Sequence, residues 1–176
     1  LKSGWLKYQK KAARQWRNRT TGNPYDQYDL EQAYRLFTLA LAGEPEMGAM
    51  NRLREEKGLS LQALWRLAAA YALAGQTETA KQLTERAGTE IKSYTGFGSS
   101  YGSAERDLAM ILETLILLNE RTKAAPIAMK ISAKLTQEYW MSTQPTAYCL
   151  LSMAKFAGIS GTSKTLAFSY KLNDGK

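Results

Sequence analysis

The fold is decided by residues 60–87, SLQALWRLAAAYALAGQTETAKQLTERA, which encode two helices of different character. The first, residues 61–74, carries a single charge, Arg66, and is apolar over most of its circumference. The second, residues 78–87, is polar or charged except for three apolar residues that can face a core, Ala80, Leu83 and Ala87. A helix that is apolar all round must be buried on all sides, whereas a helix with one apolar stripe covers something. A glycine separates the two, so the stretch predicts a helical hairpin with an inner and an outer member.

The same alternation extends through most of the chain. Apolar spacing and Gly or Pro punctuation predict eight helices, at about residues 6–17, 29–42, 47–57, 61–74, 78–87, 104–119, 123–138 and 144–157. The second, fourth, sixth and eighth are apolar over most of their circumference, while the third, fifth and seventh have one stripe and a charged back. This order predicts an all-α fold of helical hairpins with inner and outer helices, an alpha-solenoid or an alpha/alpha toroid.

Polar residues before several of these helices are predicted to cap them. A hydroxyl that can accept from the free N–H groups of a first turn precedes three helices, at Ser60, at Ser103, and at Ser142 or Thr143. Asp29 followed by Gln32 has the spacing of a capping box at the start of the second helix. Pro145 falls in the first turn of the eighth helix, where its missing N–H costs nothing.

The positive charge is concentrated at one end of the chain. The 176 residues include 24 Lys and Arg against 16 Asp and Glu, a net charge of +8. Residues 1–19 hold seven of the basic groups and no acid, and the remainder is balanced. A basic run on one helix is typical of a solvated outer helix, so we expect no nucleic-acid partner. No apolar stretch reaches the roughly 20 residues that a membrane span needs.

The residue types exclude several kinds of chemistry. Histidine is absent and Cys149 is the only cysteine, so no zinc site with His or Cys ligands and no disulfide pair is predicted. Cys149 lies among apolar residues and is predicted to be a buried, inert thiol. Some toroidal helical folds are glycan hydrolases, which need two carboxylates about 5–10 Å apart. Asp107 and Glu113 are six residues apart on one helix and point about 120° away from each other. We therefore expect no enzyme and assign no catalytic, cofactor-binding or metal-ligating residue.

Part of the deciding stretch also fits the tetratricopeptide pattern of large and small residues on paired helices, at Leu64, Leu67, Ala68, Tyr71, Ala80 and Ala87. The next repeat would have to contain residues 94–102, YTGFGSSYG, which such a repeat does not accommodate. We interpret the match as generic hairpin packing, and the loop as an extended connection whose aromatic residues plug the core. A stand-alone helical scaffold that binds peptides remains the alternative, and a ligand-contacting role for the loop remains open.

The pattern changes after Gly161. Residues 165–172 alternate polar and apolar side chains with a period of two, and residues 173–175, NDG, form a hairpin-type turn. This predicts a helical domain over residues 1–160 and a short C-terminal β segment, residues 161–176, that begins a strand-rich domain. We accordingly expect the chain to be a fragment of a longer protein.

Several strings in this sequence, by their order and spacing, resemble the bacterial alpha-2-macroglobulin-like proteins, in particular the C-terminal part of their thioester domain. The likeness extends over about residues 27–158, and the strings are AYRL (33–36), LALAG (39–43), GAMNRLR (48–54), WRLAAAYALAG (65–75), YGS (101–103), RD (106–107), and Trp140 with STQ (142–144) and TA (146–147). The resemblance implies an alpha/alpha toroid that is followed by a strand-rich domain.

The resemblance also implies a function. Members of this family are envelope proteins that inhibit proteases as a bacterial defence: cleavage of a bait segment lets the molecule rearrange around the protease, and a Cys-x-Glu-Gln thioester, where present, captures it covalently. This chain has no Cys-x-Glu-Gln, and Cys149 is followed by Leu150-Leu151-Ser152, so no reactive residue is carried over. The resemblance implies target proteases and neighbouring strand-rich domains as partners, no cofactor, and a periplasmic or envelope location with a membrane anchor in the full-length protein.

Overall fold

The computed structural model describes residues 2–19, 28–91, 102–137 and 141–158, and every regular element in these ranges is an α-helix. The helices are α1 (Lys2–Gln15), α2 (Tyr28–Leu41), α3 (Met47–Glu55), α4 (Leu61–Leu73), α5 (Thr77–Ala87), α6 (Ala104–Leu117), α7 (Arg121–Leu135) and α8 (Thr143–Phe156). The all-α prediction is therefore confirmed. The predicted β segment at residues 161–176, Trp140 and nearly all of loop 94–102 lie outside the described residues.

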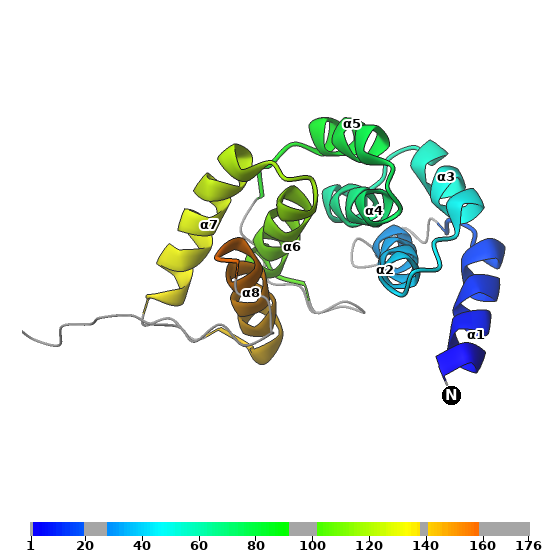
Figure 1. Ribbon diagram of the computed structural model, residues 1–176, viewed down its shortest axis with the longest axis horizontal. Coiled ribbons are helices and arrows are strands. Elements are labelled where there is room, and N and C mark those ends of the chain that lie inside the picture. Colours follow the sequence, from blue (N-terminus) through cyan, green and yellow to red (C-terminus); the bar gives the residue numbers. More distant parts are fainter. Residues whose placement is uncertain (1, 20–27, 92–101, 138–140, 159–176) are drawn as a thin grey trace, which may run out of the picture.

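The helices form two layers along an open arc (Figure 1). Helices α2, α4, α6 and α8 follow one another on its inner side, and α1, α3, α5 and α7 lie outside them. Helix α4 packs against α2 and α6 within the inner layer and against α3 and α5 in the outer layer. The predicted alternation of inner and outer helices is thus confirmed, whereas closure of the arc into a toroid stays a prediction.

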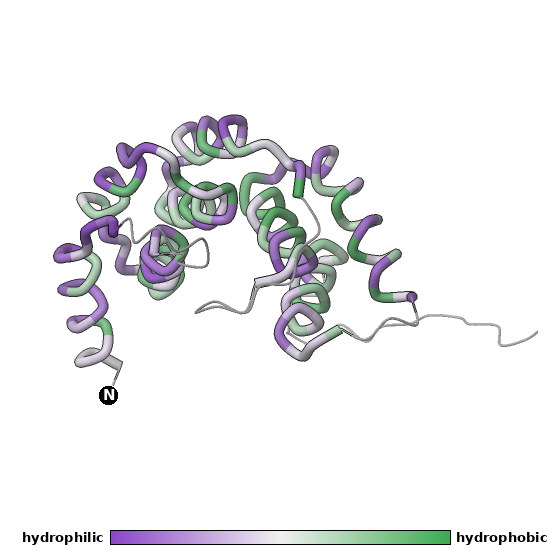
Figure 2. The backbone as a smooth tube through the Cα atoms, turned by 180° about the vertical axis from the view of Figure 1, so that it is seen from behind, coloured by the Kyte–Doolittle hydropathy of each residue, from purple (hydrophilic) through white to green (hydrophobic). Residues whose placement is uncertain are grey.

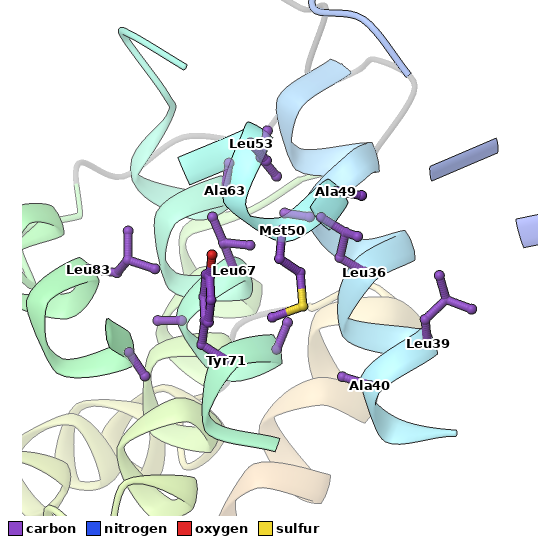
Figure 3. Close-up of a cluster of buried hydrophobic side chains, with 14 of the residues drawn as sticks. Leu36, Leu39, Ala40, Ala49, Met50, Leu53, Ala63, Leu67, Tyr71 and Leu83 are labelled. Atoms are coloured by element: carbon purple, nitrogen blue, oxygen red, sulfur yellow. The ribbon is translucent and has the colours of Figure 1, made fainter. Parts of the chain in front are cut away.

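The described helices form two hydrophobic clusters, and α4 contributes buried residues to both. All nine residues from Ala63 to Tyr71 are buried. Its Leu67 and Tyr71 face a first cluster with α2, α3 and α5, and Figure 3 shows Met50 of α3 lying between them and Leu36 of α2. Its Trp65 belongs to a second cluster with α6, α7 and α8. This double contact explains why the α4 sequence is apolar all round.

The outer helices bury only one stripe each. Helix α5 buries Ala80, Leu83 and Thr84, and α7 buries Ala124, Ile127, Ala128 and Ile131. Hydrophilic residues cover much of α1 and α5 in Figure 2. None of the helices in the described part of the chain is long and apolar enough to cross a membrane, as the sequence predicted.

Two of the predicted serine caps are confirmed. The Ser60 hydroxyl accepts a hydrogen bond from the Ala63 N–H, and the Ser103 hydroxyl accepts one from the Arg106 N–H, both at 3.2 Å. Ser142 occupies the cap position of α8, but its hydroxyl makes no capping bond. Its carbonyl accepts instead from the Thr146 hydroxyl at 2.9 Å.

The predicted capping box of Asp29 and Gln32 is wrong. Helix α2 begins at Tyr28, and Asp29 accepts hydrogen bonds from the Leu30 and Ser60 N–H groups, both at 2.7 Å. Gln32 is buried and donates to the Ala13 carbonyl at 3.0 Å. Both side chains therefore bond outside α2, Asp29 to the residue before α4 and Gln32 to a buried carbonyl of α1 that needs a partner.

The expectation that α8 is buried on all sides is also wrong. Leu150 is 56% exposed and Leu151 is 54% exposed. Of the described helices, only α6 and α7 pack against α8. One face of α8 therefore has no described helix against it, although its sequence is as apolar as that of other inner helices.

Candidate functional site

A buried ion network connects three inner helices. Arg66 of α4 is 1% exposed, and its Nη1 donates to Oε2 of Glu113 of α6 at 2.8 Å. The other Glu113 oxygen, Oε1, accepts from Nζ of Lys155 of α8 at 2.6 Å. Glu113 therefore lies between two cations, one fully buried and one at the surface.

The environment of Arg66 is aromatic on the side of α2. Its guanidinium carbon lies 4.7 Å from the ring centroid of Tyr34 and 4.3 Å from that of Phe37. Its Nε and Nη2 are buried without a hydrogen-bond partner among the described residues. Such donors are costly to bury, and the two rings offset part of that cost by cation–π attraction. Glu113 is thus the only anion that holds Arg66 in place within the described structure.

A second buried ion pair lies within α6 and is hydrogen-bonded to α4. Arg106 donates from Nε and Nη2 to Oδ1 of Asp107, at 3.1 and 2.9 Å, and both residues are almost completely buried. The other oxygen of Asp107 accepts from Nε2 of Gln62 at 2.8 Å. Asp107 lies in the first turn of α6. Its charge meets an arginine of its own helix and an amide of α4.

The two acids that the sequence analysis weighed as a catalytic pair belong to different ion pairs. Burial alone would raise the pKa of Glu113, but Arg66 and Lys155 outweigh this effect and hold the pKa below its ordinary value. Glu113 is therefore ionised at neutral pH, which suits it to a structural ion pair and not to the donation of a proton.

Because the pKa of Glu113 is lower in the folded than in the unfolded chain, its charge stabilises the fold above its unfolded pKa. We expect this contribution to be complete above about pH 4.5 and to disappear as pH falls through the lower folded pKa. The check is urea unfolding between pH 3 and 7 for the native chain and for Glu113→Gln. The difference in stability between them should shrink toward the acid end, and a constant difference would contradict the assignment.

Tyr34 connects this network to its surroundings. Its hydroxyl donates to Sδ of Met110 of α6 at 2.9 Å. Burial raises its pKa well above the ordinary value, against the lowering effect of Arg66 and with a further raising effect from Tyr148 of α8. Tyr34 therefore stays protonated and acts as a polar contact between α2, α6 and α8.

Cys149 is completely buried, as predicted. Its thiol donates to the Glu105 carbonyl, with Sγ 3.6 Å from the oxygen. Burial raises its pKa to about 11, with a smaller contribution from the Glu105 charge. The thiolate, which is the nucleophilic form, is therefore scarce at neutral pH.

We expect iodoacetamide to modify Cys149 in the folded chain far more slowly than in the urea-unfolded chain at pH 7.5. Two factors act together, since the sulfur is out of reach of the reagent and its pKa is raised to about 11. Mass spectrometry of the alkylated protein over time measures both rates. Equal rates in the two states would show that Cys149 is accessible.

Only part of this network stands out in the sequence. Arg66 stood out as the one charge in an apolar helix, and Asp107 and Glu113 were noted as acids. Arg106 and Lys155 were not identified as members of a site, because a single sequence does not show which helices meet. The described residues contain no group of three His, Cys, Asp or Glu side chains that could hold a metal ion.

Geometrically, the described chain is a two-layered helical domain whose inner helices are connected by buried charges. Comparison with models of known protein families, with characterised proteins and with solved structures finds no match. The family resemblance therefore depends on the sequence strings given above.

Proposed function

We propose that this chain is a non-catalytic structural and contact domain of a bacterial alpha-2-macroglobulin-like protease trap, the C-terminal part of its thioester-type toroid. The observation that carries the proposal is the two-layered order of the helices, with α2, α4, α6 and α8 inside. This order agrees with the layered toroid that the resemblance implies.

The strings that carry the resemblance have structural roles in this chain. Residues 65–75 cover most of α4 and include Arg66, and residues 106–107 form the buried pair of α6. Residues 48–54 contain Met50, whose side chain lies between α2 and α4. The resemblance thus falls on positions that build the contacts between helices, where packing restricts the choice of residue.

A protease trap needs domains that move as units when the bait segment is cut. In this chain α4 takes part in both hydrophobic clusters, and the ion network adds polar contacts from α4 to α6 and α8. Packed cores with such contacts move as rigid bodies and do not deform continuously. The chain is therefore suited to transmit a rearrangement, with target proteases and neighbouring strand-rich domains as its contacts.

The test uses the full-length protein and an active protease. Enclosure of the protease should block its hydrolysis of a large protein substrate while its hydrolysis of a small peptide substrate continues. A protease inactivated at its catalytic residue is the control, because it cannot cut the bait and should not be enclosed. Equal effects on both substrates, or no effect on either, would refute the trap.

Two further features of the proposal have tests of their own. A periplasmic or envelope location predicts that the protein is recovered from envelope fractions of the bacterium. If the full-length protein contains Cys-x-Glu-Gln, methylamine should free one thiol per thioester. An unchanged thiol count would leave noncovalent trapping as the mechanism.

The alternative function is a helical scaffold that binds peptides. The open arc of Figure 1 favours it, since helical-repeat proteins use concave surfaces of this kind. The α4–α5 hairpin also has the large and small residues of a tetratricopeptide unit at its interface. Extending the sequence in both directions discriminates the two functions, because the trap predicts strand-rich flanking domains and the scaffold predicts further helical hairpins.

A further inference from the structure

A cavity of about 280 Å³ lies between the C-terminal part of α1 and the start of α2. These two helices pack together at one end of the arc (Figure 1). Six of the residues that line the cavity carry a charge or a large ring: Trp16, Arg17, Arg19, Tyr28, Glu31 and Arg35. Its volume is just below the usual range of small-molecule sites, which starts at roughly 300 Å³, so it could hold only a small ligand.

The cavity has an excess of positive charge. Three arginines and one glutamate line it. Arg17 and Arg19 form no ion pair with any residue in the described ranges, and the only hydrogen bond of Arg17 there goes to the Trp16 carbonyl. Two other basic residues of α1 differ, because Lys10 pairs with Glu44 and Arg14 pairs with Glu46. Arg17 and Arg19 thus add positive charge at the cavity that no described acid offsets by an ion pair.

Two hydrogen bonds hold the Arg35 side chain in a defined orientation. Its Nε donates to Oε1 of Gln9 at 3.1 Å, and its Nη1 donates to Oε1 of Gln32 at 2.6 Å. Gln32 is 1% exposed and is itself fixed by its bond to the Ala13 carbonyl. Arg35 therefore needs little further ordering to contact a ligand, which favours binding.

We propose that this cavity binds a small molecule with an oxyanion group, phosphate or carboxylate, on a flat ring. Arginine guanidinium groups match the geometry of both oxyanions, and Arg17, Arg19 and Arg35 supply them. The half-buried rings of Trp16 and Tyr28 offer flat apolar surfaces beside these charges. The Glu31 carboxylate repels negative charge, so it disfavours ligands that carry several negative groups. This inference does not depend on the proposed function.

The test is a titration of the 176-residue chain with phenyl phosphate and with benzoate, followed by NMR shifts of the Trp16 indole and of the arginine side chains. Benzyl alcohol and inorganic phosphate serve as probes that lack the charge or the ring. We expect saturable binding of at least one ringed anion, with the two incomplete probes weaker by about tenfold or more. No saturable binding of either ringed anion would overturn the proposal, and inorganic phosphate binding as tightly as phenyl phosphate would overturn the ring contact.

A matched pair of variants separates the cavity from net charge. Arg17→Gln with Arg19→Gln removes two positive charges at the cavity, and Lys7→Gln with Lys11→Gln removes two from exposed positions of α1 that do not line it. The first pair should weaken binding of the ringed anion by about tenfold or more, and the second should leave it within about twofold. Equal losses in both double variants would overturn the cavity as the site. Circular dichroism of each variant checks that α1 remains helical.

Discussion

Glu113→Ala is expected to reduce the free energy of unfolding by about 3–5 kcal/mol, because it leaves a buried charge without its anion. Arg66 is 1% exposed, and two of its nitrogens already lack hydrogen-bond partners among the described residues. With Glu113 gone, the rings of Tyr34 and Phe37 would be the groups left, among the residues the structure describes, to stabilise the guanidinium. Urea unfolding monitored by circular dichroism measures the loss.

Two controls identify the cause of that loss. Glu78→Ala removes an acid from an exposed i,i+3 pair with Lys81 and should change stability by no more than about 0.5 kcal/mol. The double variant Arg66→Met, Glu113→Leu removes both buried charges and should be more stable than Glu113→Ala alone. If the double variant were the less stable of the two, the unpaired charge would not be the source of the effect.

Trp65→Ala is expected to destabilise the fold by about 3–5 kcal/mol, through the cavity that it leaves in the second hydrophobic cluster. Trp65 is 1% exposed and is the fully buried α4 residue of that cluster. Its Nε1 also donates to the Gly88 carbonyl at 2.8 Å, so the substitution removes the donor for a carbonyl at the end of α5.

The same substitution at Trp5 is the matched control, because Trp5 is 46% exposed on α1. Trp5→Ala should cost less than about 1 kcal/mol. Trp65→Phe keeps most of the apolar volume and loses the hydrogen bond, so its effect should be smaller than that of Trp65→Ala and close to about 1–2 kcal/mol. Thermal unfolding of all three variants measures this order, and a Trp5 effect as large as the Trp65 effect would contradict it.

The layered fold was predictable because the number of buried faces of a helix determines how many of its residues are apolar. The α4 sequence has one charge, and the structure places all nine of its central residues in the interior. The α5 sequence has a narrow apolar stripe, and Ala80 and Leu83 are its buried apolar residues. The serines at positions 60 and 103 were identifiable as caps because capping depends on a few neighbouring residues.

Prediction from local sequence patterns failed where a side chain bonds to a distant residue in place of a neighbouring one. Asp29 and Gln32 have the spacing of a capping box, but they bond to Ser60 and Ala13. Leu150 and Leu151 are apolar and exposed, since the described part of the chain places no helix over that face of α8. A pattern of residues indicates what a helix can bury, and the position of its neighbours decides what it does bury.

In the candidate site, too, the sequence shows the charged residues but not which of them pair. The sequence contained the lone charge of α4 and the two acids of α6, yet it did not indicate that Arg66 and Glu113 form one pair while Arg106 and Asp107 form another. Residues 47 positions apart meet in the first pair, and Lys155 is 42 positions from Glu113. The cavity between α1 and α2 was equally hidden, because it depends on how two helices pack.

The sequence was enough to predict the helical class, the alternation of inner and outer helices, and the glycines and serines that end or begin them. The physical reason is that helix formation, capping and one-sided burial depend on residues within a few turns of one another. The tertiary structure alone decided which charges pair, which apolar residues stay exposed and where a basic cavity forms. Those outcomes depend on contacts between residues far apart in the chain, whose geometry is set only when the helices pack.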